Sequence, residues 1–271
     1  MNDATAGAAI PGAASELLYR EADGIAMATF NRPQARNALT FAMYERLGEI
    51  CTALNARDDI RALIVTGAGD KAFAAGTDIS QFRDFINPDD GVRYEARIDR
   101  VLGAIESCRV PTIAAIAGAC TGGGFAIAAC CDLRIATADA RFGFPIARTL
   151  GNCLSMASLA RLSSLLGAAR LKEIVFTARL IAAAEAQAIG LVQEVVADGA
   201  ALPDRSLALA RQVAGHAPLT LRATKEGLRR LQPVIDAQAD ADLIRMCYTS
   251  ADFREGMDAF FAKRPPRWQG R

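Results

Sequence analysis

From Val110 to Cys131 the chain carries no charged side chain, and a Gly-Gly-Gly triplet lies at residues 122–124 in the middle of this run. Before the triplet, residues 111–116 are apolar and rich in β-branched side chains, which predicts a buried strand. After it, the apolar residues 125–130 predict the first turns of a buried helix. The run therefore predicts a strand, a glycine turn and a helix, all within the protein core.

A glycine turn of this kind allows another molecule to come close to the backbone. The N–H groups at the start of the helix have no partner within it, and they can stabilise an anion that forms on a carbonyl oxygen. The triplet could instead serve only the close packing of helix on strand. A membrane span is disfavoured, because the run contains Pro111 and three glycines and has Arg109 and Asp132 directly outside it.

Composition excludes several other classes of protein. The net charge of +1 gives no indication of a nucleic-acid or membrane-surface partner. The single histidine, His216, excludes most histidine-dependent chemistry, and the 7 cysteines lack the spacing of a zinc site, so no metal is expected. Since no secretory signal is evident, the cysteines predict reduced, mostly buried thiols in a cytoplasmic protein.

The order of the predicted elements indicates an α/β architecture. Residues 1–14, rich in Ala and Gly, predict a disordered leader. Asp23-Gly24 predicts a hairpin turn, and Thr40 is a suitable N-cap. Strands alternate with helices up to about residue 155, which favours an α/β fold. The predicted strands are 16–21, 25–30, 62–66, 111–116, 133–136 and 191–196, and the predicted helices are 40–56, 92–107, 125–130, 202–215, 218–231, 234–248 and 252–262.

Two glycine-marked turns follow short buried strands, namely FAAGTD at residues 73–78 and the triplet. With these two turns and several other segments in the same order, the chain resembles members of the enoyl-CoA hydratase/isomerase (crotonase) superfamily. The resemblance extends from about residue 15 to residue 271. The other segments that carry the resemblance are NRPQARNAL at 31–39, CDLRIA at 131–136, RFG at 141–143, TARLI at 177–181, GLV at 190–192 and FREGM at 253–257.

The resemblance implies an α/β fold, a crotonase-like spiral of ββα repeats with a C-terminal helical trimerisation region. It implies a crotonase core over residues 15–200 and the helical region over 201–271. The implied partners are an acyl-CoA substrate and further copies of the chain, as a homotrimer or a dimer of trimers. No separate cofactor is implied, because coenzyme A is part of the thioester substrate.

By motif match, the backbone N–H groups of Thr77 and Gly123 would form an oxyanion hole for the thioester carbonyl. A thioester enolate places negative charge on one oxygen, and each such donor is typically worth ~10²- to 10³-fold in rate. The resemblance also implies that Arg36, Ala38 and Ala75 lie along the coenzyme. Arg36 could pair with its phosphates, and so could Lys263, from the same or a neighbouring subunit, although each could equally be a solvated surface cation.

The chain departs from the pattern of the superfamily at two positions. Hydratases of the superfamily use two glutamates, and these positions are Ala126 and Ile146 here. No Asp or Glu occurs over residues 107–131 or 140–172. Because a general acid or base contributes ~10²- to 10⁴-fold, efficient two-glutamate hydration is not expected. Other polar groups could replace the glutamates: Asp78, Tyr94, Arg148, Thr149, Asn152, Cys153 and Tyr248.

The expected function is that of an acyl-CoA-processing enzyme that stabilises a thioester enolate. Isomerisation, decarboxylation and thioester hydrolysis remain open, and decarboxylation requires an oxyanion hole but no base. A second possible function, of a different class, is that of a non-catalytic acyl-CoA-binding subunit. A third possibility is a purely structural relic.

Overall fold

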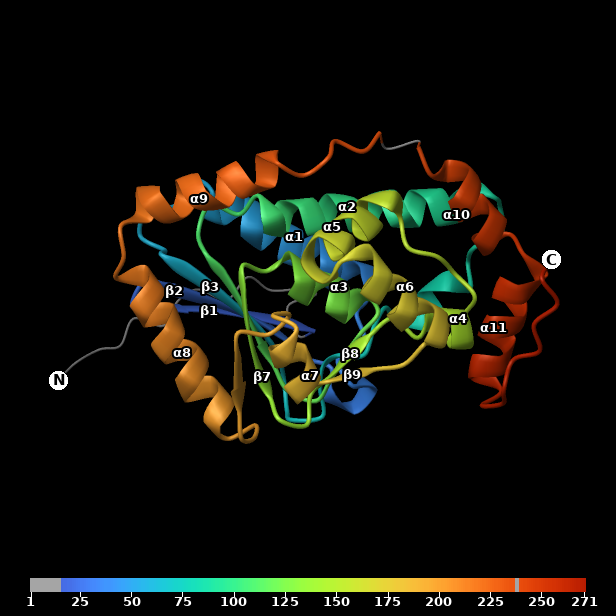
Figure 1. The fold of residues 1–271 in the computed structure, drawn as a ribbon, viewed down its shortest axis with the longest axis horizontal. Helices are drawn as coiled ribbons and strands as arrows, with labels where there is room; N and C mark the ends of the chain where they lie inside the picture. Colours follow the sequence, from blue (N-terminus) through green and yellow to red (C-terminus); the bar gives the residue numbers. More distant parts are fainter. Residues whose placement is uncertain (1–15, 237–238) are drawn as a thin grey trace.

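The computed structural model describes residues 16–236 and 239–271, so the leader predicted over 1–14 lies outside the described residues. The strands form two mixed sheets (Figure 1). The first has the order β1 (Leu17–Ala22), β2 (Ile25–Phe30), β3 (Ala62–Gly67), β5 (Thr112–Ile116), β7 (Leu133–Thr137) and β10 (Glu194–Val196). The second has the order β4 (Ala72–Ala74), β6 (Ala119–Thr121), β8 (Arg141–Gly143) and β9 (Ile181–Ala182). β1 with β2 and β8 with β9 are antiparallel, and the other pairs are parallel.

Helices connect and cover these sheets. Two short 3-10 helices are η1 (Pro33–Ala35) and η2 (Ile79–Phe82). The α-helices are α1 (Phe41–Leu54), α2 (Asp89–Glu106), α3 (Gly123–Cys130), α4 (Ile146–Thr149), α5 (Met156–Leu166), α6 (Ala168–Thr177), α7 (Ala183–Ala188), α8 (Ala201–Ala214), α9 (Pro218–Arg230), α10 (Ala241–Tyr248) and α11 (Ala251–Phe261). No helix in the described part of the chain combines the length and the apolar character that crossing a membrane requires.

Three consecutive segments follow the same plan. In each, the first strand joins the large sheet, the second joins the small sheet, and a helix follows. The units are β3-β4-α2, β5-β6-α3 and β7-β8 with α4 and α5. This is the expected ββα spiral, and it brings the loops after β4, β6 and β8 to one side of the molecule, because those strands are neighbours in the small sheet.

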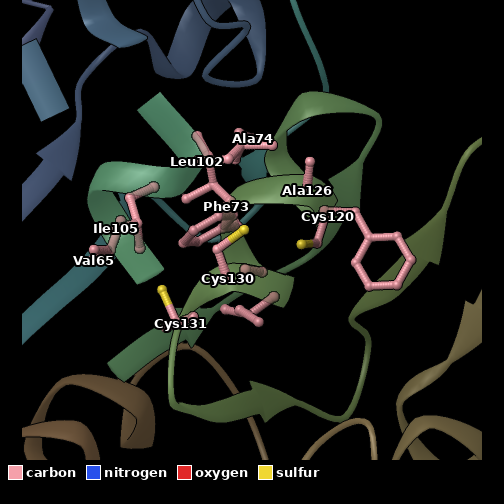
Figure 2. Packing of buried hydrophobic residues seen from close by; sticks show 14 of the residues in the cluster. Val65, Phe73, Ala74, Leu102, Ile105, Cys120, Ala126, Cys130 and Cys131 are labelled. Atoms are coloured by element: carbon pink, nitrogen blue, oxygen red, sulfur yellow. The ribbon is translucent and has the colours of Figure 1, made fainter. Parts of the chain in front are cut away.

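The central strands of the large sheet, β3 and β5 among them, are covered on both faces. α8 covers one face, and α1, α2 and α3 lie on the other (Figure 1). Successive residues of β3 face opposite sides, so Leu63 and Val65 belong to the core under α1 and α2, whereas Ile64 packs under α8. Figure 2 shows part of the larger core, where Phe73 and Leu102 lie beside Cys130.

Most elements predicted from local patterns are confirmed. The chain reverses between β1 and β2 at Asp23 and Gly24, which have φ of 52° and 74°. At the start of α1, the Thr40 side chain accepts a hydrogen bond from the Met43 N–H. The helix predicted over 234–248 was wrong in its first part, since α10 begins at Ala241. Val234 is 99% exposed, so its apolar side chain buries nothing that would stabilise a helical turn there. Residues 237–238 lie outside the described ranges.

Candidate functional site

A cavity of about 120 Å³ lies between the two glycine-marked loops, α2 and the segment after β8. Its walls are mainly apolar, and include Phe82, Ile98, Phe144 and Leu150. Such a site excludes water, so hydrogen bonds inside it are stronger than in solvent. The geometry of the two loops decides what the cavity can bind.

Each glycine of the triplet meets a different neighbour. Gly122 has φ of +53°, and a Cβ there would lie 3.4 Å from the Cα of Gly76 in the other loop. A Cβ on Gly123 would lie 1.7 Å from the Tyr44 hydroxyl oxygen, and one on Gly124 would lie 2.3 Å from the Ala74 carbonyl oxygen. The triplet therefore serves close packing, and the same packing brings the backbones of the two loops together.

Thr77 and Gly123 both line the cavity. Leu39 holds the first loop, because its N–H donates to the Gly76 carbonyl at 2.8 Å and its carbonyl accepts from the Asp78 N–H at 2.9 Å. Among the described residues, neither the Thr77 N–H nor the Gly123 N–H donates a hydrogen bond. Gly123 is the first residue of α3, where the helix offers free N–H groups and a partial positive charge.

The Thr77 side chain fixes this loop against two helices. Its hydroxyl lies 2.9 Å from the Tyr44 hydroxyl of α1 and 2.8 Å from the Tyr94 hydroxyl of α2. Burial raises the pKa of both tyrosines, so both are neutral at physiological pH. A Cβ on Gly123 would lie 3.2 Å from the Thr77 hydroxyl oxygen, which places the two loops in direct contact at this point.

The far end of α3 is held by a buried cation. Arg134 is 4% exposed, and its guanidinium donates to the carbonyls of Leu191 at 2.6 Å, Cys131 at 2.6 Å and Ala128 at 3.2 Å. The bonds to Ala128 and Cys131 satisfy carbonyl groups that the end of α3 leaves without partners, and the bond to Leu191 ties this end to the segment after α7. Because α3 begins at Gly123, the position of the Gly123 amide depends on this anchor.

The other residues proposed from the sequence are distributed more widely. Ala75 lines the cavity, and its N–H donates to the Arg36 carbonyl at 3.1 Å. Arg36 and Ala38 lie on the neighbouring loop, outside the cavity lining, and the Arg36 side chain is exposed. Lys263 follows α11, is exposed and does not line the cavity. The structure thus brings Ala75 to the two amides but leaves the two proposed cations on the surface.

The resemblance aligns two aliphatic residues of this chain with the glutamates of hydratases. Ala126 and Ile146 both line the cavity. Of the proposed replacements, Asp78 caps η2 by accepting from the Ser80 N–H, and Arg148 is exposed outside the lining. Four others line the cavity: Tyr94, Thr149, Asn152 and Cys153.

The sequence-based prediction missed Glu95 as a cavity residue. It lies on α2, 6% exposed, and the Tyr248 hydroxyl donates to its Oε1 at 2.5 Å. Burial raises the pKa of Glu95 to about 8, although the Tyr248 hydrogen bond opposes this shift. A signal was present, because Glu95 has the same helical spacing as the buried positions Gly91, Ile98 and Leu102.

No metal is part of this arrangement as far as the described residues show, since no three His, Cys, Asp or Glu side chains among them cluster as ligands. The polar groups at the cavity are backbone amides, hydroxyls, one carboxyl, one amide side chain and one thiol.

Comparison with known proteins agrees with this geometry. Residues 20–271 match the family described as enoyl-CoA hydratase/isomerase. The short-chain-enoyl-CoA hydratase of Clostridium acetobutylicum is 34% identical over 243 residues, which cover 89% of this chain and 92% of that protein. An enoyl-CoA hydratase/carnithine racemase structure from Magnetospirillum magneticum has a TM-score of 0.76 at 34% identity, covering 94% of this chain and 96% of that one. A structure of methylmalonyl-CoA decarboxylase in complex with 2-nitronate-propionyl-CoA has a TM-score of 0.80 at 29% identity, covering 94% and 99%. This chain therefore belongs to the enoyl-CoA hydratase/isomerase family of enzymes.

Proposed function

We propose that the chain binds an acyl-CoA thioester with the carbonyl oxygen between the N–H groups of Thr77 and Gly123, and that it stabilises the enolate formed there. The observation that carries this proposal is the pair of amides without acceptors, donated by separate loops to one cavity. Enolate formation moves negative charge onto the thioester oxygen. Each fixed donor at that oxygen contributes ~10²- to 10³-fold in rate.

Efficient hydration by two glutamates is not part of the proposal. The Ala126 and Ile146 side chains carry no proton to exchange, and both lie at the cavity. A chain that keeps the amides and lacks both glutamates is suited to reactions that need a stabilised enolate and few proton transfers. Isomerisation is the first candidate in this class.

Decarboxylation is the second candidate reaction. Loss of CO₂ from a malonyl-type thioester leaves an enolate directly, so no base has to remove a proton. The similarity to the methylmalonyl-CoA decarboxylase structure, with a TM-score of 0.80, supports it. Release of CO₂ from methylmalonyl-CoA distinguishes this reaction from isomerisation.

We also propose that Ala75, Ala38 and Arg36 line the path of the coenzyme from the cavity to the surface. The cations of Arg36 and Lys263 would pair with its phosphates. The hydrogen bond from the Ala75 N–H to the Arg36 carbonyl supports this path, because it joins the cavity wall to the exposed loop. Lys263 lies outside the cavity lining, so it would act at the surface or from a neighbouring copy.

A homotrimer or a dimer of trimers is the proposed assembly. None of the residues of α9 is buried, and Leu219, Leu228 and Leu231 are 75%, 61% and 81% exposed. Leu228 and Leu231 lie three positions apart at the end of α9, and exposed apolar side chains of this kind suit contact with a second copy.

A cytoplasmic location is proposed on the basis of the cysteines. All seven lie within the described ranges and are free thiols, five of them buried. Free thiols persist in a reducing compartment.

Calorimetry with two ligands tests the oxyanion site. Butyryl-CoA has the carbonyl oxygen, whereas S-butyl-CoA, a thioether of the same length, lacks it. Two hydrogen bonds of about 0.5–1.5 kcal/mol each predict that butyryl-CoA binds about 5- to 100-fold more tightly. Equal affinities would contradict the proposed role of Thr77 and Gly123, and absence of binding to either ligand would contradict acyl-CoA recognition as a whole.

Turnover is then measured with three thioesters. But-3-enoyl-CoA reports isomerisation, methylmalonyl-CoA reports decarboxylation, and crotonyl-CoA reports hydration. We expect one of the first two to react well and crotonyl-CoA to be hydrated slowly. Tight binding without any turnover would indicate a non-catalytic binding subunit.

A further inference from the structure

Glu95 is the one carboxyl group among the described residues that line the cavity. It is 6% exposed, on the face of α2 that packs into the protein. An ionisable side chain at such a position is costly to bury, and its placement at a cavity with two free amides calls for an explanation.

A chain of hydrogen bonds fixes the direction of the carboxyl. The Asn152 side-chain N–H donates to the Tyr248 hydroxyl at 3.2 Å, and the Tyr248 hydroxyl donates to Glu95 Oε1 at 2.5 Å. Glu95 Oε2 accepts no hydrogen bond from the described residues, and Glu95 lines the cavity. The orientation leaves one oxygen free for a ligand.

Asn152 provides an independent sign that the cavity takes a polar ligand. Its Oδ1 is the one fully buried side-chain nitrogen or oxygen without a hydrogen-bond partner among the described residues. Asn152 also lines the cavity. An amide oxygen can accept a hydrogen bond, but it cannot supply or remove a proton at neutral pH, so it does not replace a second carboxyl.

We propose that Glu95 is the catalytic acid and base of this site, and that it moves one proton between two carbons of the acyl chain, which shifts a double bond instead of adding water. The inference rests on the proposed function, because the proton transfer needs the enolate held by Thr77 and Gly123. It deepens that function by naming the proton carrier and the substrate class, a 3-enoyl-CoA.

The steps balance with one carboxylate and no other reactant. Glu95 Oε2 removes a proton from C2, and the electrons of the broken C–H bond form the C1–C2 double bond while the charge moves to the thioester oxygen. The protonated carboxyl then gives the same proton to C4. The thioester carbonyl forms again, and the double bond comes to lie between C2 and C3.

The surroundings of Glu95 suit a group that both takes and gives a proton. Burial is the main cause of its raised pKa of about 8, which leaves both the acid and the carboxylate populated near neutral pH. The titratable groups that face it or act on it come from several elements: Asp99, Tyr94, Tyr44, Tyr248, Asp240 and Cys153.

The test uses the full-length protein, but-3-enoyl-CoA and the variant Glu95→Gln. Glutamine keeps the size of the side chain and an oxygen that can accept from Tyr248, but it cannot carry the proton. We expect the isomerisation rate to fall about 10²- to 10⁴-fold while butyryl-CoA affinity changes less than threefold. Glu49→Gln, which makes the same exchange on the exposed surface of α1, is the matched control and should keep full activity.

A second readout does not depend on the variant. In wild-type protein, the isomerisation rate should rise with pH and level off above a pKa near 8, since the reaction begins from the carboxylate. A Glu95→Gln variant that folds and keeps its rate, or a wild-type rate without this pH dependence, would overturn the assignment of Glu95.

Binding and turnover together separate a wrong assignment of Glu95 from a wrong assignment of the oxyanion site. Wild-type protein that binds butyryl-CoA more tightly than S-butyl-CoA but does not isomerise but-3-enoyl-CoA overturns the role of Glu95 and leaves the oxyanion site in place. Protein that binds neither ligand overturns both.

Discussion

The Tyr248 hydroxyl of α10 donates a hydrogen bond of 2.5 Å to Glu95 of α2, although 153 positions of sequence separate the two residues. α10 belongs to the region after residue 200, which the resemblance assigns to trimerisation, although Tyr248 itself is among the polar groups proposed from the sequence. This contact joins a C-terminal helix to Glu95, a residue that lines the cavity, within the same chain. In Figure 1, α10 lies against one end of α2.

The variant Glu95→Gln should change how stability depends on pH. The folded pKa of Glu95 is about 8, against an ordinary value of 4.5. Between these values the folded chain holds a proton that the unfolded chain has released, so raising the pH favours unfolding. The free energy of unfolding is therefore highest, as far as Glu95 affects it, below about pH 4.5. It falls as the pH rises through 8, by up to about 5 kcal/mol in total.

Urea unfolding of both proteins over this pH range measures the effect. We expect the free energy of unfolding of Glu95→Gln, relative to wild type, to increase as the pH rises. Parallel curves for the two proteins would show that Glu95 has an ordinary pKa in the folded chain.

Tyr248→Phe should move the pH profile without abolishing the reaction. The hydroxyl stabilises the carboxylate form of Glu95, so its removal raises the pKa of Glu95 further. We expect the pH at which the isomerisation rate is half of its maximum to increase by about one unit, with a smaller loss of rate at high pH than in Glu95→Gln. An unchanged profile would mean that Tyr248 contributes only to packing.

Local turn and cap signals could be recognised in the sequence, whereas the shortest strands could not. The hairpin turn at Asp23-Gly24 and the Thr40 cap are local signals, and both elements form as predicted. Strands β4, β6 and β8 have three residues each, which is too short for a side-chain period to be recognised.

The family motifs indicated the two loops at the cavity but not the carboxyl. The acids and bases proposed from the sequence include Tyr94, the neighbour of Glu95 on α2, but not Glu95 itself. Its partner Tyr248 is brought close only by the packing of α10 on α2. A glutamate at a buried position of an amphipathic helix was the available signal, but a helix pattern alone does not show which cavity the helix faces.

Gly123→Ala should disturb the site through Tyr44. The new Cβ would lie 1.7 Å from the Tyr44 hydroxyl oxygen, so the tyrosine or the loop must move. We expect a loss of about 1–3 kcal/mol in unfolding free energy and a large loss of activity.

The double variant Gly123→Ala with Tyr44→Phe isolates this clash. Removing the hydroxyl relieves the closest contact, although the Cζ atom remains 3.0 Å away, so rescue should be partial. The cost of the pair in a double-mutant cycle should be smaller than the sum of the single costs. If the losses of unfolding free energy in the two single variants simply add in the double variant, the effect of Gly123→Ala does not come from contact with the Tyr44 hydroxyl.

Arg134→Met should destabilise the chain by about 3 kcal/mol or more, because three buried carbonyls lose their donor. The expected effect on butyryl-CoA binding is also a decrease, since α3 carries the Gly123 amide. Chemical denaturation and calorimetry measure the two effects. A variant with wild-type stability would show that water satisfies these carbonyls equally well.

Leu228→Glu should weaken the proposed assembly. Wild-type protein should have a mass in solution that is a multiple of the 28.7 kDa chain, and a charge at position 228, beside the exposed Leu231, should shift it toward the monomer. Light scattering measures both. A wild-type monomer would exclude the proposed oligomer, and Arg222→Glu, a charge change on the same helix, serves as the control.

Helix α3 is constrained along its whole length, by the amide at Gly123, by Gly124 against Ala74 and by Arg134 beyond its last turn. Evolution therefore has little freedom to alter this helix without losing the fold. The opposite wall, formed by α2 and the segment after β8, carries polar side chains, namely Tyr94, Glu95, Thr149 and Asn152. In such a scaffold, new reactions arise when the proton-carrying group relocates to another wall while the place where charge accumulates stays the same.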